Sequence, residues 1–80
     1  MQPVAVGDRF TVIKDGIEYE FEAAEEGGYV VSVPLYPSCL SDGDTFEEAL
    51  VNIEDALRDT LLAAKELGLD IPAELHAAIP

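Results

Sequence analysis

Basic side chains are scarce in this sequence. Only 4 of the 80 residues are lysine or arginine, against 17 aspartates and glutamates, so the formal net charge is -13. Binding to a nucleic-acid backbone needs clustered basic side chains that replace the counterions of the phosphates. Anionic membrane surfaces attract proteins through the same kind of cluster. The composition therefore argues against direct nucleic-acid or membrane binding and favours a basic protein as partner.

Cysteine and long apolar runs are equally scarce. Cys39 is the single cysteine and cannot form an internal disulfide, so a reducing, cytoplasmic location is expected. No apolar run approaches the roughly 18 residues of a transmembrane helix, and the start lacks a signal-peptide pattern. With 49% hydrophobic residues and no repeat or linker, the chain is predicted to form one domain over residues 1–80.

The first half of the chain alternates apolar and polar side chains, which is typical of half-buried strands. Three strands are expected at residues 10–14, 17–23 and 29–33. Asp15-Gly16 and Gly27-Gly28 are two-residue turn signals, so the strands should form an antiparallel meander. The valine-rich third strand is predicted to lie inside the sheet and to be better covered than its neighbours. A short fourth strand is expected around residues 38–41.

From Thr45 the apolar spacing changes to three and four residues, which predicts one helix ending near Leu67. Its apolar stripe comprises Phe46, Ala49, Leu50, Ile53, Ala56, Leu57, Leu61, Ala64 and Leu67. Thr45 and Glu48 form a capping box, and Gly68 suits a left-handed C-terminal cap. Residues 72–79 are a candidate for a short final helix. The expected fold is α+β: an antiparallel meander of three to four strands with one long helix on one face.

Two motifs between residues 29 and 50 resemble those of the HicB antitoxin family. An apolar strand ends in a proline-rich corner, and a Gly-Asp-Thr-x-x-Glu-Ala sequence then opens the helix. The matching residues are Pro34, Pro37, Cys39, Gly43, Asp44, Thr45, Glu48 and Ala49. The resemblance covers about residues 17–72. Leu35 and Ser38 depart from the family's Asp and Gly in the corner.

This resemblance implies a partial ribonuclease-H-like fold (β-β-β-α) without nuclease activity. It also implies a role in type II toxin–antitoxin systems, in which the antitoxin covers the active site of a small basic HicA toxin that cleaves messenger RNA. The 80 residues leave no room for the DNA-binding module that many members append, so no operator binding is expected. An alternative is a stand-alone structural or regulatory homo-oligomer without a toxin. A third is a small hydrolase with a metal site.

Catalytic residues are not expected. Cys39 and His76 are the only candidates for a thiolate–imidazole pair, and nothing in the sequence brings them together. Asp42 and Asp44 flank a glycine but lack the further oxygen ligands of a calcium loop, and turn formation and helix capping account for both. We therefore predict no enzyme, no metal and no cofactor.

Glu18, Glu20 and Glu22 point the same way from the second predicted strand. Two interpretations are open: a solvated sheet face that discourages aggregation, and a docking surface for basic residues of a toxin. The open edges of so small a sheet also predict a homodimer or a higher even-numbered oligomer.

Overall fold

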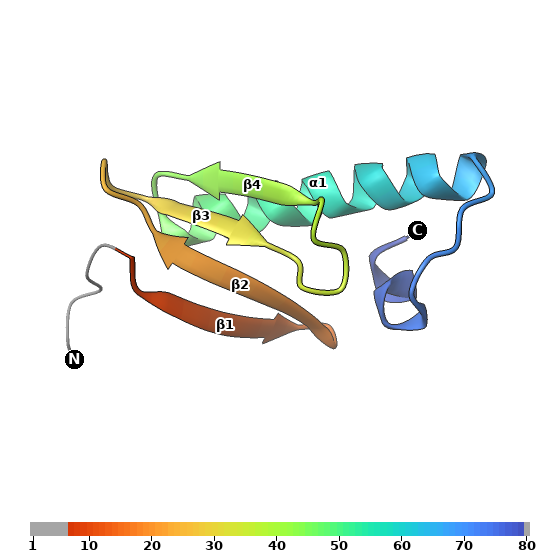
Figure 1. Cartoon of the computed structure of the whole chain (residues 1–80), viewed down its shortest axis with the longest axis horizontal. Coiled ribbons are helices and arrows are strands. Elements are labelled where there is room, and N and C mark those ends of the chain that lie inside the picture. The colour runs from red at the N-terminus through yellow and green to blue at the C-terminus, as the bar shows by residue number, and fades with distance from the viewer. Residues whose placement is uncertain (1–6, 80) are drawn as a thin grey trace.

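A computed structural model, which describes residues 7–79, shows one antiparallel sheet with a long helix on one face (Figure 1). The elements are β1 (Arg9–Lys14), β2 (Ile17–Ala23), β3 (Tyr29–Ser32), β4 (Leu40–Gly43), the helix α1 (Phe46–Glu66) and the short 3₁₀ helix η1 (Ala73–Ala78). The strands lie side by side in chain order. The predicted α+β meander is thus confirmed, with the fourth strand two residues later than expected.

Local turn chemistry sets the register of the first hairpin. Asp15 and Gly16 have φ angles of 53° and 78°, the left-handed pair that a type I′ turn requires. The turn places Lys14 opposite Ile17 and Phe10 opposite Phe21. One face of the sheet therefore collects the apolar side chains of both strands.

The third strand lies inside the sheet, between β2 and β4, as predicted. Its better coverage was not confirmed. Val31 is buried against the helix, whereas Val30 is 43% exposed on the opposite face. The valine run is covered on one side only because a single helix can cover only one face of the sheet.

Both ends of α1 are capped where the sequence indicates. The Glu48 backbone N–H donates to the Thr45 hydroxyl at 3.1 Å. At the other end, the N–H groups of Gly68 and Leu69 donate to the carbonyls of Lys65 and Ala64, a Schellman motif. Within residues 7–79, no helix is long and apolar enough to cross a membrane.

The core lies between α1 and the sheet. Five helix residues are buried: Ala49, Ile53, Leu57, Leu61 and Ala64. Leu67, predicted to belong to the apolar stripe, is instead 75% exposed, because the chain leaves the helix there and turns at Gly68. Beyond the turn the chain folds back beside α1 (Figure 1), and Leu75 of η1 is fully buried in the same core.

The joint between β4 and α1 is unusually close. A Cβ atom on Gly43 would overlap the backbone of Ala49 in the first turns of the helix. Ala49 itself is fully buried. Only glycine fits opposite this turn, so the end of β4 lies directly against the start of α1.

Candidate partner-binding surface

The sheet face that points away from α1 carries the three predicted glutamates. Their β2 neighbours Ile17, Tyr19 and Phe21 are buried on the helix side. Glu18 is exposed, and Glu20 and Glu22 are half-buried on the other side. The prediction that the three carboxylates share one face is thus confirmed, and that face lies opposite the helix.

Arg9 changes the electrostatics of this face. β1 pairs with β2 so that Arg9 lies opposite Glu22. The Arg9 Nε atom donates to Glu22 at 2.7 Å, and its Nη1 atom lies 3.8 Å from Glu20. The hydrogen bond to Glu22, aided by the charges of Glu22 and Glu20, raises the pKa of the Arg9 guanidinium. Glu20 and Glu22 therefore share the charge of Arg9. Of the three glutamates, Glu18 alone makes no ion pair among residues 7–79.

Apolar side chains also lie on this face, which the sequence did not predict. Ile13 is 70% exposed and Leu40 is 61% exposed, and Val30 lies between β2 and β4 on the same side. A shallow hollow of about 200 Å³ lies among Arg9, Glu20, Glu22, Val30, Ser32 and Leu40. The surface therefore combines carboxylates with apolar contacts. The alternation of side chains within β3 and β4 could have predicted that Val30 and Leu40 share this face, but only once the pairing register of the strands is known.

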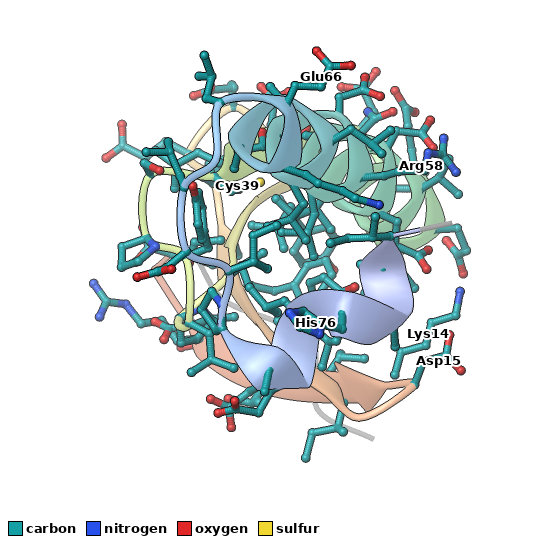
Figure 2. All side chains as sticks on the ribbon, turned by 90° about the vertical axis from the view of Figure 1, so that its right-hand side faces the viewer. Lys14, Asp15, Cys39, Arg58, Glu66 and His76 are labelled. Carbon is teal, nitrogen blue, oxygen red and sulfur yellow. The ribbon has the colours of Figure 1, made fainter. Side chains whose placement is uncertain are left out.

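The remaining cations are mostly held by acids as well. Lys14 lies 2.9 Å from Glu54 and ties the first hairpin to α1, while Arg58 lies 2.9 Å from Asp55 on the outside of the helix. Figure 2 shows Lys14 at the end of the hairpin and Arg58 on the helix. Three of the four basic side chains are thus engaged, and Lys65 alone makes no ion pair within the described residues. The surface is left with a large excess of negative charge.

The motif residues occupy two places. Pro34 and Pro37 lie exposed in the corner between β3 and β4, where the N–H groups of Tyr36 and Cys39 donate to the carbonyls of Val33 and Tyr36. The others form the joint between β4 and α1: Gly43, Asp44, Thr45, Glu48 and Ala49. Asn52 supports this joint by donating to the Asp42 carbonyl at 2.8 Å.

The candidates for catalysis lie apart. Cys39 is buried beneath α1 and His76 is exposed on η1, at separate places in Figure 2. Burial raises the pKa of the Cys39 thiol, with a hydrogen bond to Thr60 acting in the opposite direction, so the nucleophilic thiolate is disfavoured. Within residues 7–79, no group of three or more His, Cys, Asp or Glu side chains is placed to hold a metal ion. Asp42 and Asp44 therefore belong to no such group among these residues.

Comparison with known proteins identifies the family. The protein family described as "HicB_like antitoxin of bacterial toxin-antitoxin system" matches residues 18–78 of this chain. The UPF0150 protein Ta0767 of Thermoplasma acidophilum is 42% identical over 50 residues, which cover 62% of this chain and 72% of that protein. Antitoxin HicB 1 of Photorhabdus laumondii is 47% identical over 49 residues, 61% of this chain and 32% of that antitoxin. No solved structure gives a significant match.

A relative from Haemophilus phage HP1, an uncharacterized 14.9 kDa protein in the rep-hol intergenic region, is 57% identical over 30 residues. These residues cover 38% of this chain and 23% of the phage protein. The family match takes in the whole of β3, β4, α1 and η1 and all the motif residues. The chain therefore belongs to the HicB-like antitoxin family of bacterial toxin–antitoxin systems. Its match spans about a third of the length of Antitoxin HicB 1.

Proposed function

We propose that this chain is an antitoxin, or an antitoxin-derived module, that neutralises a small basic HicA-type toxin by protein–protein binding. Membership of the HicB-like family over residues 18–78 is the observation that carries the proposal. On this proposal the chain acts in the cytoplasm, without catalysis, metal or cofactor, and it covers the active site of a toxin that cleaves messenger RNA. The likeness of its sheet and helix to part of ribonuclease H stays a prediction from the family resemblance.

The surface electrostatics support a basic partner. With a net charge of -13 and three of its four basic side chains already held by acids, the molecule attracts cations from a distance. The outer sheet face adds the apolar contact that long-range attraction cannot supply, since Ile13 lies opposite Glu18, and Val30 and Leu40 lie further across the same face. Association with the toxin should therefore slow as salt rises, while dissociation should depend on the apolar contacts.

Co-expression with a basic protein encoded next to this chain tests the proposal. We expect the two proteins to purify together and the toxin to lose its cleavage of messenger RNA in the complex. A toxin that neither co-purifies nor loses activity would end the antitoxin interpretation.

A charge-reversal pair tests whether the outer sheet face docks the toxin. Reversing Glu20 or Glu22 would place a lysine beside Arg9, so Glu18→Lys is the cleaner variant. Its control is Glu66→Lys, which changes the net charge equally at the outer end of α1 (Figure 2). We expect Glu18→Lys to lower the association rate about three- to tenfold more than the control does. Equal effects of the two variants would show that only the overall charge matters.

The alternative function, a homo-oligomer without a toxin, is favoured by one observation. Ile13 and Leu40 expose large apolar side chains on the sheet face, which a second copy could cover as well as a toxin could. The co-expression experiment separates the two functions, because an oligomer without a toxin would leave the neighbouring protein free and active.

A further inference from the structure

β1 forms an open edge of the sheet (Figure 1). A two-residue turn makes the flanking residues Lys14 and Ile17 a hydrogen-bonded pair, so alternate residues of β1 bond to β2. The bond from the Ala23 N–H to the Asp8 carbonyl, at 3.0 Å, keeps the same alternation at the far end. The N–H and C=O groups of the intervening Arg9, Thr11 and Ile13 therefore point away from the sheet. Among residues 7–79, no strand pairs with them.

Two of the usual protections of an edge strand, proline and a bulge, are missing within β1, which carries charged side chains only at its ends, Arg9 and Lys14. Between Arg9 and Lys14 the strand contains no proline, and it pairs with β2 residue for residue without a bulge. Phe10 and Val12 are only partly buried, although the Phe10 ring stacks on Phe21 at 5.2 Å. Ile13 is largely exposed on the outer face. Backbone groups and apolar side chains are thus presented together along one strand.

Charge indicates what kind of partner this edge fits. The first sixteen residues contain two acids, Asp8 and Asp15, and two bases, Arg9 and Lys14, so they carry no net charge. All of the -13 comes from the other 15 acids and 2 bases. A second copy that meets this one through β1 therefore brings no net charge to the contact from this segment, whereas a basic protein is attracted to the acidic remainder of the chain.

We propose that β1 pairs antiparallel with β1 of a second copy of this chain, about a two-fold axis at Thr11. In this register Thr11 lies opposite itself and Arg9 lies opposite Ile13. All the outward N–H and C=O groups of Arg9, Thr11 and Ile13 are then satisfied. On the helix side Phe10 faces Val12, and on the outer side the Arg9 stem covers Ile13. A shift by two residues would leave one of the three residues unpaired in each copy. The two sheets join into one continuous sheet, an isologous dimer.

Sedimentation equilibrium of the purified chain, without any toxin, tests the proposal independently of the antitoxin function. The wild type should dimerise, and more tightly at high salt, because screening weakens the repulsion between two strongly acidic subunits. Thr11→Pro removes an outward N–H that the monomer does not use, and edge strands tolerate proline at such positions. We expect this variant to keep its circular dichroism spectrum and to weaken dimerisation at least about tenfold.

Cross-linking tests the register directly. Residues opposite each other in a hydrogen-bonded pair have Cα atoms about 5.5 Å apart, within the range of a disulfide. Thr11→Cys should therefore form a disulfide-linked dimer at least about tenfold faster than Leu40→Cys, an exposed control on the same face of β4. The native Cys39 is buried and should not interfere.

Three results would overturn the proposal. One is a wild type that stays monomeric at every salt concentration. If Thr11→Pro then also abolishes toxin binding, the edge belongs to the toxin and not to a second copy. Another is a dimer that Thr11→Pro leaves as strong as the wild type. The third is cross-linking through Leu40→Cys in preference to Thr11→Cys.

Discussion

Leu57→Ala tests the layer between α1 and the sheet. Leu57 lies in the middle of the helix and is 0% exposed. Truncating a fully buried leucine costs about 2–5 kcal/mol, because apolar burial is lost and a cavity remains. A chain of 80 residues, at roughly 0.05–0.15 kcal/mol per residue, has a total stability of about 4–12 kcal/mol. One substitution should therefore remove a large fraction of the stability.

Urea unfolding followed by circular dichroism measures this effect. We expect the midpoint to fall with little change in the slope, and the melting temperature to drop by roughly 10–30 °C. Leu67→Ala is the matched control, since the same side chain is removed at an exposed position just beyond the helix; it should change stability by less than about 0.5 kcal/mol. If the two variants lose similar stability, the assignment of the buried helix face is wrong.

Three further predictions concern the cap, the joint and the response to alkali. Thr45→Ala removes the acceptor of the Glu48 N–H and should lower the free energy of unfolding, measured in urea, by about 1 kcal/mol. An unchanged free energy of unfolding would show that the cap does not stabilise the helix. Gly43→Ala forces a methyl group against the Ala49 backbone and should cost about 1–3 kcal/mol, so an unchanged melting temperature would contradict the close joint. Burial, with smaller effects from nearby acidic groups, raises the pKa of Tyr19 from 10.0 to about 12, so folding favours its protonated form. That contribution is complete below pH 10 and is lost as the pH rises towards 12, and Tyr19→Phe should flatten this part of the stability curve.

Elements with local signals were predictable to within a residue or two. Thr45 and Glu48 mark the start of α1 through a bond between residues three apart, and Gly68 marks its end. Asp15-Gly16 likewise defines its hairpin from two adjacent residues. Such features depend on backbone preferences that neighbouring residues decide, so periodicity and capping rules locate them without knowledge of the rest of the fold.

The chemistry of the candidate surface depends on contacts between distant residues. Arg9 meets Glu22 only because the hairpin register places them opposite each other, thirteen residues apart in sequence. The exposure of Val30 depends on which sheet face the helix covers, and the burial of Leu75 depends on the chain folding back beyond Gly68. Periodicity gives the alternation of each strand, but it does not give the neighbours across the sheet. The three glutamates were therefore predicted to share a face, while the cation and the apolar residues among them were not.

The close contact between Gly43 and Ala49 bears on how family membership should be interpreted. The Gly-Asp-Thr-x-x-Glu-Ala sequence contains one residue that must lack a side chain, one that caps the helix and one that is small enough to be buried against the strand end. Gly43 and Ala49 let β4 lie directly against α1, Thr45 caps the start of the helix, and none of these roles requires a ligand. Sequences that share this signature share a way of joining strand to helix. On the function proposed here, the residues that select a partner are expected on the outward faces of the strands, where substitutions leave that joint untouched.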